Sequence, residues 1–147
     1  DDRIINIYGE TIAIFGMGRI GCSAYEKMCE LHGSVVVGID FDADLVAQHQ
    51  QKGRKVLHGD PSDTDFWEKV DRQLSLEIVM LALPKLSSNL EALEQLQQIS
   101  FAGKIMATAR YPDEVKILTD AGATDVYDMY TKAGAGFAEY VEERIAS

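Results

Sequence analysis

Three glycines near the start of the chain, Gly16, Gly18 and Gly21, have the spacing of a loop that holds a phosphate group. A short apolar run, residues 11–15, precedes them, and a helical pattern over residues 19–32 follows. In such a loop the first glycine permits a tight turn, the second lets the backbone approach a diphosphate, and the third lets the helix pack closely on the strand. This context predicts a nucleotide site.

Backbone groups and one carboxylate are the expected binding groups of this site. The amide N–H groups near Arg19 and Ile20 have no partner within the predicted helix, and together with the helix dipole they attract an anion. Asp40 ends the second predicted strand, 40 − 16 = 24 residues after Gly16. A carboxylate there accepts both hydroxyl groups of an adenosine ribose and repels a 2′-phosphate, so we expect AMP-type or NAD-type ligands rather than NADP. The alternative is that Asp40 only begins a turn.

Further candidates follow the other predicted strands, at the edge where such sheets bind ligands. They are expected to line the adenine (Asp60, Pro61 and Ser62), to cover the ligand with apolar surface (Leu83 and Pro84) and to balance phosphate charge (Arg19 and Arg110), and Phe41 is expected among the residues that bind the cofactor. Residues 60–63 are also a good turn and helix cap, and both arginines are also ordinary surface residues, so these alternatives stay open. Asp42 is expected to cap the helix that follows it.

The charge balance disfavours several classes of partner. Lys and Arg number 14 and Asp and Glu number 24, so the net charge is 14 − 24 = −10. Nucleic acids and anionic lipids are bound by clustered cations, so we expect neither as a partner. No apolar run approaches the roughly 18 residues of a membrane span, and the acidic opening "DDRIIN" does not resemble a signal peptide.

The two cysteines, Cys22 and Cys29, lie 29 − 22 = 7 residues apart on one predicted helix, too far for a disulfide between them. We expect reduced thiols in the core. The alternative is that Cys22, close to a helix N-terminus that favours the thiolate, senses redox state. The histidines have no metal-ligand spacing, so no metal site is expected.

Short apolar runs alternate with longer helical patterns along the chain. The predicted strands are residues 11–15, 34–39, 55–59, 77–83, 104–109 and 124–129, and the predicted helices are 19–32, 43–52, 63–73, 87–98, 112–121 and 133–146. This alternation predicts a single α/β domain, a Rossmann-like doubly wound sheet of six parallel strands in the order 3-2-1-4-5-6. Residues 1–10 are expected to be an N-terminal connector and residues 11–147 the nucleotide-binding domain.

Several helix ends carry recognisable signals. Glycines follow four predicted helices, where a residue in the left-handed conformation is favoured: Gly33, Gly53, Gly103 and Gly122. Asp63 and Asp113 lie near predicted helix starts as candidate caps.

Five segments occur in an order that resembles a known family: "IAIFGMGRIG", "VVGIDFDADLV", "VLHGDPSD", "IMATAR" and "LTDAGATDVY". They resemble the nucleotide-binding regulatory domains of potassium channels and transporters, called RCK, KTN or TrkA-N domains. Within that family the chain is most similar to the cytosolic domain of Kef-type, glutathione-regulated potassium efflux antiporters. The resemblance covers roughly residues 10 to 146.

This resemblance implies a function beyond what the composition indicates. Such domains bind NAD(H) or AMP, form dimers through their final helix, here residues 133–146, and signal to a membrane pore. The matching positions are Gly16, Gly18, Arg19 and Gly21 for the phosphates, Asp40 for the ribose and Asp60 for the adenine. In Kef-type members glutathione acts where Arg110 stands here. The implied location is the cytoplasmic side of the cell membrane, beside a potassium transporter in the same chain or in a separate subunit.

Three functions fit the sequence. The first is a ligand-gated regulatory module without catalysis, because no Ser/His/Asp or Cys/His arrangement follows the predicted strands. The alternative is the NAD-binding half of an oxidoreductase, which the glycine loop and Asp40 suit equally well. A domain for coenzyme A or a sugar nucleotide is a third possibility, which Asp40 disfavours.

Overall fold

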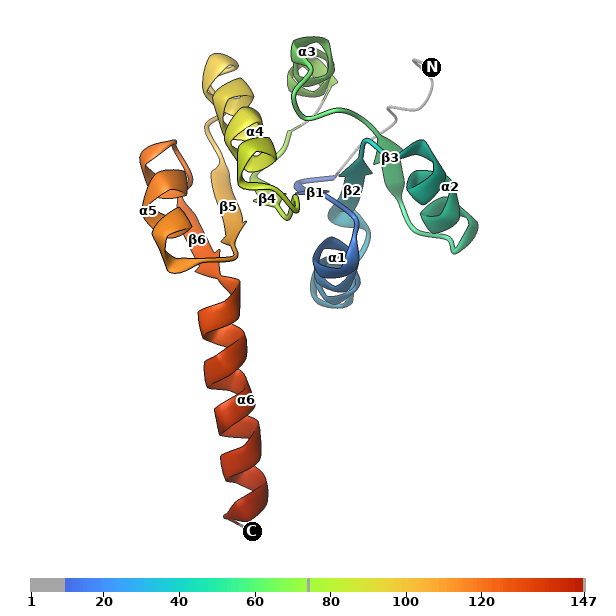
Figure 1. The fold of residues 1–147 in the computed structure, drawn as a ribbon. Coiled ribbons are helices and arrows are strands. Elements are labelled where there is room, and N and C mark those ends of the chain that lie inside the picture. Colours follow the sequence, from blue (N-terminus) through green and yellow to red (C-terminus); the bar gives the residue numbers. More distant parts are fainter. Residues whose placement is uncertain (1–9, 74, 147) are drawn as a thin grey trace.

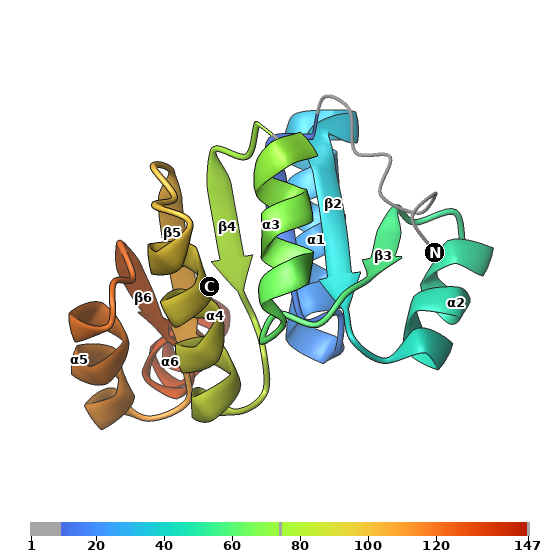
Figure 2. The same cartoon turned by 90° about the horizontal axis from the view of Figure 1, so that it is seen from above.

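The computed structural model describes residues 10–73 and 75–146, which form one six-stranded parallel sheet with helices on both faces (Figures 1 and 2). The strands are β1 (Ile12–Phe15), β2 (Val36–Asp40), β3 (Val56–His58), β4 (Ile78–Leu81), β5 (Lys104–Ala109) and β6 (Asp125–Asp128). The helices are α1 (Arg19–His32), the short 3₁₀ helix η2 (Gly33–Val35), α2 (Ala43–Gln51), α3 (Thr64–Gln73), α4 (Leu86–Gln98), α5 (Pro112–Asp120) and α6 (Met129–Ile145). The sheet order β3-β2-β1-β4-β5-β6 confirms the predicted Rossmann-like fold.

Two apolar clusters hold the helices against the sheet. On one face, Tyr25 of α1 and Val46 of α2 pack with Ile12 and Ile14 of β1. On the other face the cluster contains Phe15 from β1 and residues from α3, α4 and α5, including Trp67. β1 lies at the centre of the sheet and all four of its residues are buried, as its unbroken apolar sequence predicts for a strand covered on both sides.

The last helix, α6, differs from the other helices of the described chain and leaves the body of the domain (Figure 1). It begins at Met129, four residues before the predicted start at residue 133, because the Asp128 side chain accepts a hydrogen bond from the Thr131 amide and caps it there. None of its residues is buried. Aromatic side chains such as Phe137, which is 69% exposed, therefore stand open.

Most of the predicted helix ends and caps are confirmed, and two predictions, for Gly103 and Asp113, are wrong. Gly33, Gly53 and Gly122 have positive φ, as predicted. Gly103 does not: α4 already ends at Gln98, and Ser100 takes the left-handed conformation with φ 55°. Gly103 is needed instead for close packing, since a side chain there would come within 2.5 Å of the Phe101 ring.

Two of the three predicted helix caps are confirmed, and the third is wrong. Asp42 and Asp63 accept hydrogen bonds from amides two residues ahead, at the starts of α2 and α3. Asp113 does not cap α5. It lies inside the first turn, because Tyr111 is the N-cap residue and Pro112 occupies the first helical position.

Three remaining expectations concern the N-terminal connector, membrane-spanning segments and metal sites. Apart from Glu10, the predicted connector 1–10 lies outside the described residues. Within 10–73 and 75–146, no helix is both long and apolar enough to span a bilayer. In the same ranges no three side chains of His, Cys, Asp or Glu are grouped so that they could hold a metal ion.

Candidate functional site

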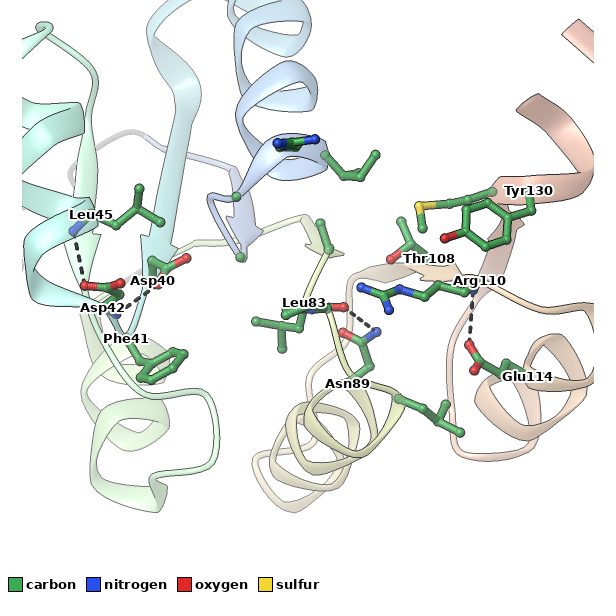
Figure 3. A pocket seen from close by; sticks show the side chains of 18 residues that line it. Asp40, Phe41, Asp42, Leu45, Leu83, Asn89, Thr108, Arg110, Glu114 and Tyr130 are labelled. Atoms are coloured by element: carbon green, nitrogen blue, oxygen red, sulfur yellow. Dashed lines mark hydrogen bonds between the residues drawn. The ribbon is translucent and has the colours of Figure 1, made fainter. Parts of the chain in front are cut away.

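A cavity of about 620 Å³ opens at the carboxyl ends of the central strands, where β1 and β4 lie side by side (Figure 3). This is the position at which open α/β sheets bind ligands, because the crossover connections leave the two strands in opposite directions. Nine of the predicted site residues line it: Gly16, Gly18, Arg19, Ile20, Asp40, Phe41, Leu83, Pro84 and Arg110.

The glycine loop between β1 and α1 has the geometry that its spacing predicts. Gly16 has φ 95°, and a side chain there would come within 2.6 Å of the Ala82 carbonyl oxygen. Gly21 does not line the cavity, but its missing side chain is equally necessary, since a Cβ atom would collide with the Gly16 carbonyl. Gly18 is different, because a Cβ atom there would have no neighbour within 4 Å. The space above Gly18 is therefore open to a ligand.

The first turn of α1 is built as an anion site. Gly18 is its N-cap residue, so no side chain caps the turn, and the turn contains no acidic residue. In α2, by contrast, the Asp42 carboxylate caps the helix and Asp44 lies in the first turn. The N–H groups at the start of α1 thus keep their hydrogen-bonding capacity for a ligand, and no carboxylate within the first turn of the helix neutralises the positive end of its dipole.

Asp40 joins the glycine loop to the end of β2. Its Oδ2 atom accepts a hydrogen bond of 2.7 Å from the Met17 amide, and its Oδ1 atom accepts one of 2.9 Å from the Asp42 amide. The residue is only 8% exposed, yet it lines the cavity. A carboxylate has about four acceptor positions, so two remain for ribose hydroxyl groups. Asp40 therefore does begin a turn, and it can bind a ribose as well.

A second side chain holds the same loop, and the sequence reasoning missed it. The Nε2 atom of buried His49, on α2, lies 2.9 Å from the Met17 carbonyl oxygen, so the ring donates a hydrogen bond there. Nδ1 of the ring then accepts from Arg54 at 3.2 Å. Met17 is thus fixed through both its amide and its carbonyl. The sequence does show an isolated histidine on the apolar side of a short helix. That pattern alone does not identify Met17 as its partner, because the contact depends on how the fold places the glycine loop.

Asp60, Pro61 and Ser62 lie after β3 and do not line the cavity. The Oδ1 atom of Asp60 accepts hydrogen bonds from the amide and the hydroxyl of Ser62, and the Pro61 carbonyl accepts one from the Trp67 indole. These contacts form the turn that the sequence offered as the alternative. Their contact with adenine stays a prediction.

The other half of the cavity lies over β4 and β5. Leu83 and Pro84 follow β4, and the Arg110 side chain extends from the end of β5 into the space beside them (Figure 3). Glu114 accepts a hydrogen bond from the Arg110 amide at 3.1 Å, which fixes the backbone of this turn. Asn89, on α4, also lines this half and is buried. The sequence analysis did not single it out as a site residue.

The start of α6 closes this end of the cavity. Met129 and Tyr130, its first two residues, are lining residues. The Tyr130 ring packs edge-on against Tyr111, with ring centroids 5.8 Å apart and an interplanar angle of 80°. A ligand in the cavity would therefore meet the helix that projects from the domain.

Cys22 and Cys29 are both free thiols, as predicted, but both are half-buried and neither lies in the core. Burial, together with a hydrogen bond to the Glu26 carboxylate, raises the pKa of the Cys22 thiol above its ordinary value, and the nearby Arg54 only partly opposes this. Proximity to the helix N-terminus therefore does not lower the pKa of Cys22, and this direction gives no support to the redox alternative.

Similar folds occur in proteins of several kinds. The NAD(P)-binding domain of an exopolyphosphatase-related protein from Archaeoglobus fulgidus aligns with 91% of this chain and 98% of its own, at 16% identity and a TM-score of 0.82. The AMP-bound C-terminal domain of Kef from Shewanella denitrificans aligns with 94% and 83%, at 16% identity and a TM-score of 0.75. The NAD-bound GsuK channel aligns with 80% and 21%, at 22% identity and a TM-score of 0.68. A search of curated proteins found no match.

At these identities the structural neighbours establish the fold alone. Two of them were solved with an adenine nucleotide bound, AMP in one and NAD in the other. The family itself is identified from the sequence, since the model of the TrkA-N domain matches residues 12–128, from the first strand to the last. The chain therefore belongs to the TrkA-N domain family.

Proposed function

We propose that this domain binds an adenine nucleotide, AMP or NAD(H), and regulates an attached potassium efflux or transport system at the cytoplasmic face of the cell membrane. The observation that carries the proposal is the uncapped first turn of α1, facing the cavity beside a carboxylate that suits a ribose. Membership in the TrkA-N family, and the nucleotides bound in the Kef and GsuK structures, support it.

The cavity suggests how the nucleotide is held. Phosphate oxygens accept hydrogen bonds from the amides of Arg19, Ile20 and Gly21, where no Cβ atom at Gly18 obstructs them. The ribose hydroxyl groups donate to the two free acceptor positions of Asp40. The exposed ring of Phe41 stands at the mouth of the cavity and offers a surface on which the adenine can stack (Figure 3).

Arg19 and Arg110 are the cations that line the cavity among the described residues. Glutathione, which the resemblance to Kef-type domains implies for Arg110, would find one arginine there with Glu114 beside it. A nucleotide phosphate has the α1 amides in addition. The adenine nucleotide is therefore the better-supported occupant.

The regulatory step passes through α6. Because Tyr130 lines the cavity and packs on Tyr111, a bound ligand changes the contacts that hold the base of this helix. A ligand shifts a conformational equilibrium only by its difference in affinity for the two states, and such couplings are typically about 1–3 kcal/mol. AMP and a dinucleotide that fill the cavity to different extents can thus have different effects.

The partner that we propose for α6 is a second copy of this chain. Its exposed apolar residues recur on one stripe, at Tyr130, Phe137, Val141 and Ile145. A hollow of about 410 Å³ lies at the edge of the sheet, beside the half-buried Met106 and the exposed Tyr127. A domain that carries both an open apolar helix and an open sheet face can cover both in a two-fold symmetric dimer.

An enzymatic role is not favoured. The titratable side chains around the cavity are carboxylates, two arginines and Tyr130, and none is paired with a histidine. His58, the histidine nearest to a strand end in the sequence, lies 2.8 Å from the Phe41 carbonyl and supports the loop after β2. The NAD-binding half of an oxidoreductase, the alternative that fits the sequence, is not favoured for the same reason.

Calorimetric titration with AMP and NAD tests the proposal. In the wild-type domain both should bind, whereas Gly18→Ala should lose at least about tenfold in affinity, because its methyl group enters the space of the phosphate. The melting temperature of this variant should stay close to that of the wild type, since a Cβ atom at Gly18 meets no other atom. Gly21→Ala is the contrasting variant and should unfold at a much lower temperature. Failure of the wild type to bind either nucleotide would reject the proposed function.

A further inference from the structure

Asn89 carries an unused hydrogen-bond acceptor at the cavity, and we propose that it is a specificity residue that favours an adenine dinucleotide over AMP. The inference rests on the proposed function and deepens it, because it names the ligand that fills the whole cavity. Asn89 lies on α4, is 2% exposed and is one of the lining residues.

The amide of Asn89 is only half satisfied. Its Nδ2 atom donates to the Leu83 carbonyl oxygen, but its buried Oδ1 atom has no hydrogen-bond partner among the described residues. Buried polar atoms in folded proteins are nearly always paired, so an orphaned acceptor at a cavity indicates a missing donor. A ligand that donates a hydrogen bond would remove the cost of leaving this oxygen unpaired.

The position of Asn89 identifies which part of a ligand can reach it. In the proposed mode of binding, AMP occupies the half of the cavity over β1 and β2, between the glycine loop and Asp40. Asn89 lies in the other half, below Leu83 and near the Arg110 side chain (Figure 3). A ligand must therefore extend past the phosphates to meet it. The second ribose and the carboxamide of a nicotinamide dinucleotide carry O–H and N–H donors in that part of the molecule.

The side chain can also turn toward such a donor. Its one hydrogen bond, to the Leu83 carbonyl, is 3.3 Å long, beyond the usual range of N–H···O bonds. The terminal torsion of asparagine is broad, so rotation of the amide is inexpensive. Little holds the amide in its present orientation, and a ligand donor needs only a small rotation to reach Oδ1.

Gln95 provides a matched control on the same helix. Its Oε1 atom is also buried without a hydrogen-bond partner in the described chain, and its Nε2 atom donates to Ser62, but it does not line the cavity. Asn89→Leu and Gln95→Leu therefore remove the same kind of orphaned acceptor, one at the cavity and one away from it. Each substitution also removes a hydrogen bond donated to a backbone carbonyl, at Leu83 or at Ser62, so both should lower the melting temperature slightly and to a similar extent.

The test is calorimetric titration of the domain and both variants with NAD and with AMP. Asn89→Leu should weaken NAD about five- to tenfold, as expected for one hydrogen bond, and leave AMP within about twofold. Gln95→Leu should change neither. Equal losses for AMP and NAD in Asn89→Leu would show that Asn89 only shapes the cavity, and unchanged NAD affinity would show that it makes no contact. Either result overturns the inference while leaving AMP binding by the wild type, and hence the proposed function, intact.

A measurement on the wild type keeps the inference testable if the variant does not fold. The side-chain Nδ2 resonances of Asn89, followed by ¹⁵N NMR, should shift when NAD is added and stay in place with AMP. A shift with both nucleotides, or with neither, contradicts the assignment.

Discussion

Replacing Asp40 with Ala should weaken both the fold and the recognition of the ribose. The carboxylate accepts hydrogen bonds from the amides of Met17 and Asp42, at 2.7 and 2.9 Å. Each hydrogen bond to a charged group contributes about 1.5–3 kcal/mol, and the two are not fully additive, so we expect a loss of about 3 kcal/mol in the free energy of unfolding. In a domain of this size that corresponds to a melting temperature lower by about 6–12 °C. Asp44→Ala, which removes a nearby exposed carboxylate, is the control and should change it much less.

The ribose contact can be isolated by comparing AMP with 2′-deoxy-AMP. The wild type should prefer AMP about tenfold, because one hydroxyl donor to the Asp40 carboxylate is missing in the deoxy ligand. Asp40→Ala should bind the two ligands equally, at a temperature well below its melting point. Calorimetry and thermal unfolding together measure both effects. If the variant kept the preference for AMP, or melted with the wild type, the assigned role of Asp40 would be wrong.

Three further predictions concern the surroundings of the site. His49→Leu should weaken nucleotide binding several-fold by freeing the Met17 carbonyl, and His49→Gln, which can still donate to it, should restore most of the affinity in the same titration. Iodoacetamide should alkylate Cys22 slowly at pH 7–8, because the raised pKa of its thiol leaves little thiolate. Glu26→Gln should speed the reaction, and an unchanged rate in this variant would contradict the role assigned to Glu26. Phe137→Glu should convert the proposed dimer to a monomer, as measured by light scattering. Lys116→Glu, on the exposed side of α5, is the control and should leave the dimer intact. A wild type that is itself monomeric would refute the proposed dimer.

The order of the sheet and the glycine loop could be predicted because each depends on local sequence. An apolar strand, three glycines and a carboxylate at the end of the next strand fix one arrangement, and Gly16 and Gly21 occupy positions where other residues collide. Asp42 as a cap follows equally from its position before α2. Each of these features carries a signal in a short stretch of sequence, although the Gly16 side chain would collide with the distant Ala82.

The contacts that could not be predicted join elements far apart in the sequence. His49 holds Met17 across 32 residues, and Asn89 is significant only because the fold leaves its oxygen unpaired at the cavity. The early start of α6 was missed because Asp128 is both the last residue of β6 and the N-cap of the helix, so no loop separates the two elements. The conformation of Ser100 was missed for a related reason, since a helix can end in a left-handed residue that is not glycine.

The most direct test of the account follows the backbone amides of the first turn of α1 by ¹⁵N NMR during titration with AMP. The account predicts that the amides of Arg19, Ile20 and Gly21 shift most, together with Phe41 beside the ribose carboxylate. Saturable shifts confined to another surface, with the α1 amides unmoved, would contradict the claim that this uncapped turn is where the nucleotide binds.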